Sequence, residues 1–457
     1  MDETATLAEL VKETDLDDVS PEAVAHAKRS IRDFVGVAMY GSQHEVGSTL
    51  MSYVDEFASA GDAVVFGHGT SDAPHAALAN GTFGHAVDFD DTFESVVIHP
   101  SGSAFPAALA AADRDDKSGR DVLTGYIVGL EAAYRIGRSV SPSHWTKGWH
   151  STGSVGVFGA TAAASSVLDL SVEAIQRAFG IAGSSASGMQ KNAGTMTKPL
   201  HAGHAATMGI RAALLSQKGF TSNPSILGGE NGYGTLYTSE DGYSPYHITN
   251  PDHHGWAVLD NGFKPYPSGV VTHAPMEALR NIVSEHELTP EDVESVTVTM
   301  DRTVSEKLDS KEPRDGLSAK FSYEFCLAAV LREQTPGVHE FTDEYVRESD
   351  TRAAMEKIER DPVDNLFAES TEAEASYGAR VKVRTKAGHE HVEEVRTAPG
   401  GPSNPLSDER LREKFTECVE TVLNTEDTSH LWEIIGEMEE PGTLTELREL
   451  TKSGADV

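Results

Sequence analysis

Helix-length segments rich in alanine, glycine and serine most constrain how this chain can fold. One segment starts at Ser20 and Pro21, which suit a helix N-terminus, and ends near Gly41. Small residues on successive turns let helices pack closely. We therefore predict a large all-helical region, with further helices at about residues 100–113, 120–138, 154–168, 171–182 and 199–218.

The sequence changes character near Lys264, where KPYPSG forms a breaker-rich link. VESVTVTM (293–300) has the alternation of a strand, and RVKVRTKAGHEHVEEVRT (380–397) reads as a hairpin turning near Gly388. Helical periodicity returns in ERLREKFTECVETVL, 409–423. The predicted fold is mainly α with a smaller α+β domain, divided into residues 1–263 (helical), 264–402 (smaller α/β) and 403–457 (helices closing back on the first domain).

Charge and cysteine content exclude several classes of protein. The 457 residues carry a net charge of −35, spread along the chain, which disfavours binding to nucleic acid or an anionic membrane. No segment reaches the roughly 18 apolar residues of a membrane span. Cys326 and Cys418 are the only cysteines, too few for an iron–sulfur cluster or a disulfide framework. We expect a cytoplasmic protein solvated for high salt, as in a halophile.

Four cationic or titratable residues stand at expected junctions. His99 and Lys198 precede Pro100 and Pro199, prolines suited to the first position of a helix. His150 precedes a serine and a threonine that can cap the next helix, and Lys264 stands at the domain junction. Helix N-termini attract anions, so convergence of these groups would create an anion pocket. Solvated lysines and locally bonded histidines are the alternative.

The acidic stretch GHAVDFDDTFESVVIHPSG (84–102) contains candidates for proton transfer. Asp88 is a candidate base, and Thr92 would bind substrate or orient a carboxylate; at i and i+4 they share a face if the segment is helical. Asp90 and Asp91 would cap helices or pair with bases, since adjacent acids cannot point the same way. A solvated acidic turn or a cation site is the other reading.

Metal, nucleotide and nucleophile motifs receive little support. His201 and His204 lie three apart on one helix face, but no third ligand stands at a compatible spacing. No G-x-G-x-x-G or G-x-S-x-G is present. We expect no metal and no organic cofactor.

Five stretches, in order and spacing, resemble the MmgE/PrpD family. They are GHAVDFDDT…IHPSG, KGWHSTGSVGVFGATAAA, GTMTKPLHAGHAATMGIRAALLSQKGFTS, GFKPYPSGVVTHAPMEA and KFSYEFCLAAVL, and the resemblance runs over nearly the whole chain. This family comprises 2-methylcitrate dehydratase, cis-aconitate decarboxylase and an iminodisuccinate epimerase. The resemblance implies a homodimer in which a helical domain and an α/β lid enclose a site for a small di- or tricarboxylate, without metal or cofactor.

The motifs carry the family's functional positions onto this chain. As the resemblance implies, the catalytic residues are Asp88, His99, His150 and Lys198, and the substrate-binding residues are Thr92, Lys264 and His273. His273 is open to a second reading, as a histidine that packs the lid.

Two departures from the family's decarboxylases bear on the reaction. Those proteins have a histidine where this chain has Gly269 and an active-site tyrosine where it has Phe325. The departures disfavour decarboxylation and favour dehydration of a 2-methylcitrate-like hydroxy acid. An epimerase using the same carbanion chemistry and a carboxylate-binding paralogue without turnover are the alternatives. The sequence does not assign the general acid and the general base.

Overall fold

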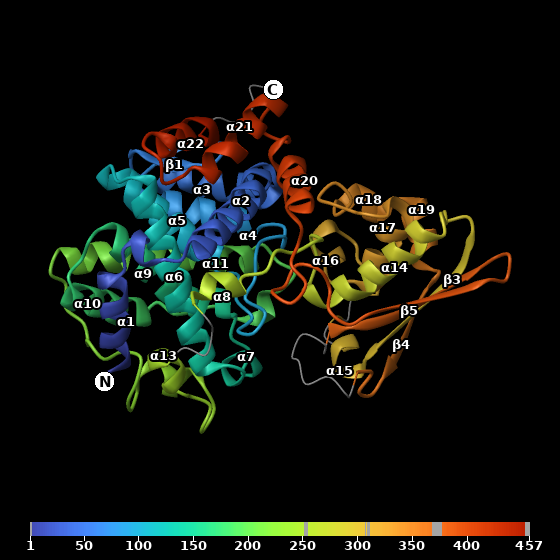
Figure 1. Ribbon diagram of the computed structural model, residues 1–457, viewed down its shortest axis with the longest axis horizontal. Coiled ribbons are helices and arrows are strands. Elements are labelled where there is room, and N and C mark those ends of the chain that lie inside the picture. Colours follow the sequence, from blue (N-terminus) through green and yellow to red (C-terminus); the bar gives the residue numbers. More distant parts are fainter. Residues whose placement is uncertain (1, 251–254, 307, 309–310, 368–376, 453–457) are drawn as a thin grey trace. The chain divides into compact units, whose positions relative to one another are not determined.

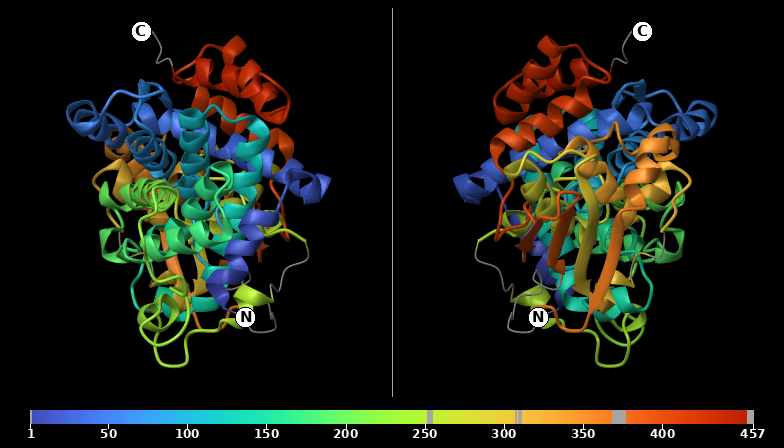
Figure 2. Two further views of the ribbon diagram at one scale, coloured as in Figure 1. Left: turned by 90° about the vertical axis from the view of Figure 1, so that its left-hand side faces the viewer. Right: turned by 90° about the vertical axis from the view of Figure 1, so that its right-hand side faces the viewer.

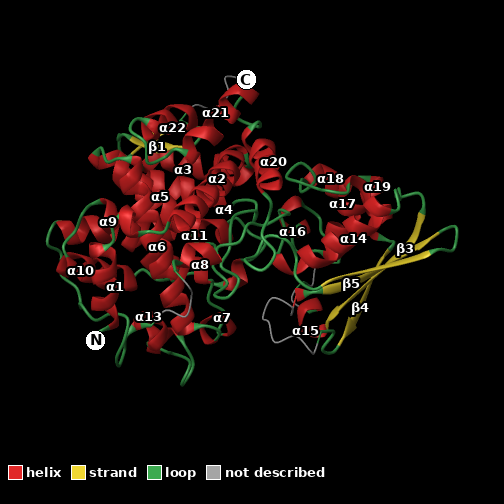
Figure 3. Cartoon of the chain, in the orientation of Figure 1, coloured by secondary structure: helices red, strands yellow, loops and turns green. Residues whose placement is uncertain are grey.

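The computed structural model describes residues 2–250, 255–306, 308, 311–367 and 377–452, which form two compact units. Unit 1 contains residues 1–86, 90–261 and 412–457, and unit 2 contains residues 87–89 and 262–411. Helices dominate, and the longer strands all belong to unit 2 (Figure 3). The predicted fold class, mainly helical with a smaller α/β part, is confirmed.

Unit 1 is built from helices and one short hairpin (Figure 1). Its N-terminal elements are α1 (Glu3–Glu13), η1 (Leu16–Asp18), α2 (Pro21–Gln43), α3 (Glu45–Phe57), β1 (Ala63–Val65), β2 (Gly69–Ser71) and α4 (Ala73–His85). The central elements are α5 (Ser101–Asp115), α6 (Gly119–Val140), α7 (Ser143–Thr146), α8 (Ser151–Ser154), α9 (Gly156–Val167), α10 (Val172–Gly183), η2 (Gln190–Asn192) and α11 (Thr197–Gln217). After these come α12 (Tyr233–Tyr237), α13 (Tyr246–Thr249) and η3 (Ala257–Asp260), then α20 (Asp408–Val419), α21 (Thr425–Gly436) and α22 (Thr443–Thr451).

Helices α4, α5, α9 and α11 pack against one another in the core of unit 1. The contact between α4, α5 and α11 is made by backbone, because glycines stand there. A Cβ on Gly81 would lie 2.6 Å from the carbonyl oxygen of Gly102 and 2.9 Å from the Cα of Gly203. Real Cβ atoms are not found so close to other atoms, so Gly81 accepts no side chain without movement of a helix, and the same holds for Gly203, whose Cβ would lie 2.2 Å from the Leu78 carbonyl oxygen.

Unit 2 contains a four-stranded sheet with helices packed against it, and the right-hand view of Figure 2 shows its strands side by side. The strand order is β4 (Ile358–Val363), β3 (Val293–Asp301), β5 (Ala379–Thr385) and β6 (Glu390–Val395). Strand β3 pairs with β4 in parallel and with β5 antiparallel. The remaining elements are η4 (Val270–Thr272), α14 (His273–Glu285), α15 (Arg302–Ser305), α16 (Gly316–Ala319), α17 (Tyr323–Glu333), α18 (Asp343–Arg347) and α19 (Ser349–Met355).

Burial alternates along the inner strands of this sheet. Val296, Val298 and Met300 of β3 are buried, as are Val381 and Val383 of β5. Side chains on a strand point alternately to its two faces, so one face of the sheet packs against helices α14 and α17. The predicted hairpin is present, and Gly388 in its turn has the left-handed φ of 88°.

Several predicted local features differ from the structure. Helix α11 starts at Thr197, so Lys198 lies inside its first turn and not before the helix. Residues 88–92 are not helical, because Asp88 has a left-handed φ of 57°. Among the described residues, no helix has both the length and the apolar character needed to cross a membrane.

Candidate active site

A loop between α4 and α5 carries most of the predicted acidic residues. Its backbone turns at Asp88, and Phe93 and Ile98 pair in an isolated β-bridge. The Thr92 hydroxyl donates to the carbonyl oxygen of Ile98 at 3.3 Å. Thr92 therefore helps to close the loop, whereas its predicted contact with substrate stays a prediction.

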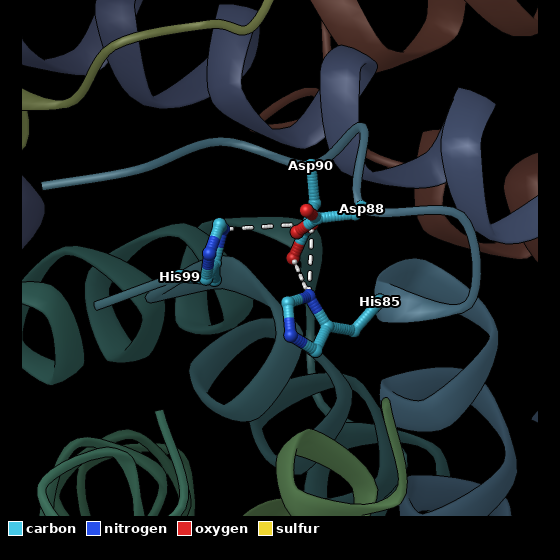
Figure 4. A group of neighbouring side chains, drawn as sticks. All are labelled: His85, Asp88, Asp90 and His99. Atoms are coloured by element: carbon cyan, nitrogen blue, oxygen red, sulfur yellow. Dashed lines mark hydrogen bonds and ion pairs between the residues drawn. The ribbon is translucent and has the colours of Figure 1, made fainter. Parts of the chain in front are cut away.

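Asp90 lies between two histidines (Figure 4). The His85 Nδ1 atom is 2.9 Å from both carboxylate oxygens, and the His99 Nδ1 atom is 3.5 Å from one of them. Asp90 and His85 are buried, and the side chain of His99 is 12% exposed. A carboxylate in this position stabilises positive charge on either ring.

The hydrogen bonds of His99 indicate where its protons lie. Its Nδ1 atom is 2.9 Å from the carbonyl oxygen of Asp91, which can only accept a hydrogen bond. Nδ1 therefore carries a proton, and in the neutral ring the lone pair is on Nε2. The backbone N–H of His99 donates to the Thr152 hydroxyl at 3.2 Å. Thr152 lies inside α8, whose N-cap residue is His150, so neither Ser151 nor Thr152 is the cap that the sequence offered.

His150 and His201 form a buried pair. Their Nδ1 atoms are 2.9 Å apart, so one ring must donate and the other must accept. The His150 ring also stacks on His85, with ring centroids 5.7 Å apart. We call His85, Asp90, His99, His150 and His201 the histidine cluster.

Burial and nearby positive charge keep the pair neutral. Burial, followed by the charge of Lys198, holds the pKa of His150 well below its usual value. The pKa of His201 falls to about 4, mainly through burial and then through the charge of His85, with smaller contributions from His204 and Lys198. The structure thus brings His99, His150 and Lys198 of the predicted set into one region of unit 1.

The other predicted residues, Asp88, Lys264 and His273, belong to unit 2. The buried Lys264 ammonium donates to the carbonyl and carboxylate oxygens of Asp88, both at 3.0 Å, and to the carbonyl oxygen of Ser268 at 3.3 Å. The same Ser268 oxygen lies 3.2 Å from His273 Nε2. Lys264 therefore has a carboxylate partner within the protein, which the sequence did not indicate.

The two departures from the decarboxylase pattern have different surroundings. Gly269 follows Ser268 directly, and a Cβ there would lie 3.4 Å from the Phe321 ring, an ordinary contact. Phe325 is fully buried in the core of unit 2 and packs edge-on against Phe341 and Tyr345. The ring of Phe325 is thus a core side chain, and only the Gly269 departure lies beside the Lys264 group.

Asp91 belongs to a second buried polar region, which we call the aspartate network. Its carboxylate contacts the Ser101 hydroxyl and the Asn261 amide, and it accepts a hydrogen bond from the backbone N–H of Ser101, the first residue of α5. The Ser101 hydroxyl lies 2.5 Å from the Tyr126 hydroxyl. Burial and then the charge of Asp33 raise the pKa of Asp91 to about 8. The network comprises Asp33, Asp91, Ser101, Tyr126, Asn261 and Lys414, whose ammonium lies 2.6 Å from Asp33.

The histidine cluster has donor atoms that suit a divalent metal, but its Nδ1 atoms already serve other partners. The Nδ1 atoms of His85 and His99 face the Asp90 carboxylate and the Asp91 carbonyl oxygen. A metal ion at Asp90 would have to replace these N–H groups. The geometry therefore fits a hydrogen-bonded cluster for moving protons better than a coordination sphere.

Sequence reasoning did not assign a catalytic role to His85 or His201. His85 lies in the quoted GHAVDFDDT motif, five residues before Asp90. The spacing of His201 and His204 points only to metal binding, yet the hydrogen-bond partner of His201 is His150. The pairing joins residues 51 positions apart, so no local pattern could have revealed it.

Two family models match the chain. The MmgE/PrpD N-terminal domain matches residues 5–245, and the MmgE/PrpD C-terminal domain matches residues 266–440. These matches confirm the resemblance drawn from the motifs.

Curated relatives match over nearly the whole chain. Cis-aconitate decarboxylase of Mus musculus is 29% identical over 98% of this chain and 93% of its own length. Cis-aconitate decarboxylase of Homo sapiens is 30% identical, covering 92% of this chain and 89% of its own. Cis-aconitate decarboxylase of Aspergillus terreus is 24% identical, and the match covers 87% of this chain and 85% of the relative's length.

Proposed function

Because the chain belongs to the MmgE/PrpD family, we propose that it is a cofactor-independent lyase that removes water from a 2-methylcitrate-like hydroxy di- or tricarboxylate. The family and the curated relatives support a lyase-type function on carboxylates. Dehydration is our more specific proposal, and it rests on the histidine cluster.

The observation that carries the proposal is the contrast between two histidines of the cluster. Removal of water needs a neutral base for the C–H proton and a protonated acid for the leaving hydroxide. Burial and Lys198 keep His150 neutral, whereas Asp90 stabilises positive charge on His99. We assign His150 as the base and His99 as the acid.

The proposed reaction proceeds through a carbanion. His150 accepts the proton from the carbon next to a carboxylate, and the C–H electron pair passes into an aci-carboxylate. The charge of Lys198 stabilises this extra negative charge. The electron pair then forms the double bond as the C–O bond breaks, and His99 donates a proton to the leaving hydroxide, which departs as water. Asp88, Thr92, Lys264 and His273 belong to the proposal through their family motifs.

A substrate panel tests the proposal. Purified protein in molar salt is incubated with citrate, 2-methylcitrate, isocitrate and cis-aconitate, and the ultraviolet absorbance of a conjugated product is followed. We expect the largest rate with a hydroxy acid of the 2-methylcitrate type. Release of carbon dioxide from cis-aconitate, without dehydration of any hydroxy acid, would contradict the dehydratase assignment.

Decarboxylation of cis-aconitate is the second candidate, because the relatives reported above are named for it. Gly269 argues against it, since no histidine side chain stands beside the Lys264 group at that position. Replacement of Gly269 by histidine separates the candidates: in a dehydratase it lowers the rate with hydroxy acids, and in a decarboxylase it raises the release of carbon dioxide.

Isotope exchange separates the remaining alternatives. In heavy water, an epimerase incorporates deuterium at carbon and forms the other stereoisomer without loss of water. A carboxylate-binding paralogue incorporates no deuterium. We further propose that the protein is cytoplasmic and forms a homodimer adapted to high salt. Light scattering across a range of salt concentrations tests the dimer and its dependence on salt.

A further inference from the structure

A cavity of about 950 Å³ opens in unit 1 beside the histidine cluster. It is lined by apolar and polar residues of α3, α4 and α11, by Ser59 and Asp72, and by residues between 187 and 192. His201 and His204 of α11 both line it, whereas His150 does not. His201 therefore touches this space and the buried His150.

The geometry of His201 connects two environments. Its Nδ1 atom lies 2.9 Å from His150 Nδ1, and the side chain also lines the cavity. His150 is 5% exposed and His201 is 9% exposed, so both rings are largely removed from solvent. An imidazole can take up a proton on one nitrogen and release a proton from the other.

We propose that His201 is a positioning residue that relays protons between His150 and water in the cavity. The proposal rests on the proposed function, in which His150 accepts a proton from carbon. Protonated His150 passes its Nδ1 proton to His201 Nδ1, and His201 releases a proton from Nε2 to water. At each transfer an N–H bond breaks as a new N–H bond forms on the accepting ring or a new O–H bond forms on water, and each ring changes tautomer until its protons rearrange with water after product release.

The charged neighbours of His201 favour rapid release of a proton that reaches its ring. Lys198 and His204 lie on the same helix, His85 approaches from α4, and His150 is the hydrogen-bond partner. Positive charge at Lys198 and His85 disfavours a further positive charge on His201, so a proton that reaches it is released quickly. Burial lowers the pKa of His204 as well, so His204 does not serve as a fixed positive charge.

The experiment compares His201→Gln with His204→Gln, a matched control on the same helix and the same cavity. We expect His201→Gln to lower kcat about tenfold with KM within about twofold, and added imidazole to restore most of the rate. His204→Gln keeps the rate. A His201→Gln variant with an unchanged rate, or with a loss that imidazole does not restore, would overturn the proposal.

A second readout needs no substrate and therefore separates this proposal from the proposed function. Nitrogen-15 NMR of the histidine side chains measures how fast the His150 ring proton exchanges with water. We expect exchange about tenfold slower in His201→Gln, and in His201→Leu as a second variant, than in wild type or His204→Gln. Equal exchange rates in all four proteins would contradict the relay even if no acid is turned over.

Discussion

Asp90 and Asp91 are neighbours in the chain and both are fully buried, yet they serve different polar regions. Asp90 faces two imidazole rings in the histidine cluster, whose His201 reaches a cavity. Asp91 faces a hydroxyl and an amide in the aspartate network, which joins α2, α5, α6 and α20. The comparison suggests that the first region moves protons and the second holds helices together. Mutations should therefore separate activity from stability.

The largest effect is expected for His150→Asn. Loss of the proposed base should lower kcat/KM by about 10³- to 10⁴-fold, while the free energy of unfolding changes by no more than about 1 kcal/mol. Steady-state kinetics and guanidinium unfolding measure the two quantities. His144→Asn is the control: His144 is also buried, with a pKa lowered to about 4 chiefly by burial, but lies outside the cluster. Equal activity losses in the two variants would contradict the assignment of His150.

Lys414→Met should show the opposite pattern. It leaves the Asp33 carboxylate buried without its ammonium partner and should lower the free energy of unfolding by about 3 kcal/mol, with little change in kcat at low temperature. Lys12→Met is the matched control, because Lys12 pairs with Asp169 at the surface. Its loss should lower the free energy of unfolding by less than about 1 kcal/mol. If chemical unfolding shows that both variants lose a similar free energy of unfolding, the aspartate network does not hold helices together.

Lys198→Ala, like His150→Asn, should reduce activity more than stability. Removal of charge beside the His pair should lower kcat by about 100-fold, equivalent to about 2.7 kcal/mol, and leave the protein folded. Lys191→Ala, an exposed lysine seven residues earlier, should keep the wild-type rate. Wild-type turnover by Lys198→Ala would remove Lys198 from the mechanism.

The aspartate network should also give stability a distinctive dependence on pH. Asp91, with a pKa raised to about 8, stays protonated in the folded protein, whereas the unfolded carboxyl ionises near 3.8. The folded state therefore binds more protons between these values, and this group's contribution to stability falls by about 1.4 kcal/mol per unit as pH rises. Unfolding midpoints of Asp91→Asn between pH 6.5 and 8 should show a weaker decline than wild type. Identical slopes would contradict a protonated Asp91.

The contribution of the histidine cluster to stability should change with pH in the opposite direction and less strongly. His201 has a pKa lowered to about 4, so below pH 6.5 the unfolded state takes up a proton that the folded state does not. Stability should fall on acidification from pH 7 to pH 5, by about 1–2 kcal/mol for this residue. His201→Gln should show a smaller acid loss in guanidinium unfolding, and an unchanged acid loss would mean that His201 is already protonated in the folded state.

Much of the fold could be predicted because helix and strand patterns are local. The predicted helix 171–182 corresponds to α10 (Val172–Gly183), and the strand 293–300 to β3 (Val293–Asp301). The start of α11 was wrong by two residues, because a proline suits any position of the first helical turn.

The candidate site was less predictable, because its geometry depends on contacts between distant segments. Motifs pointed to His99, His150 and Lys198, which the structure places in one region. The His150–His201 bond and the Lys264–Asp88 ion pair needed the folded chain, since they join residues 51 and 176 positions apart.

The backbone contact of α4, α5 and α11 at Gly81, Gly102 and Gly203 has a consequence for engineering. These helices carry or flank His85, His99, Lys198 and His201, so a methyl group added at Gly81 or Gly203 would push the helices apart and move those side chains. Libraries that seek new acid substrates should therefore keep Gly81 and Gly203 fixed and vary side chains in the loops and in unit 2.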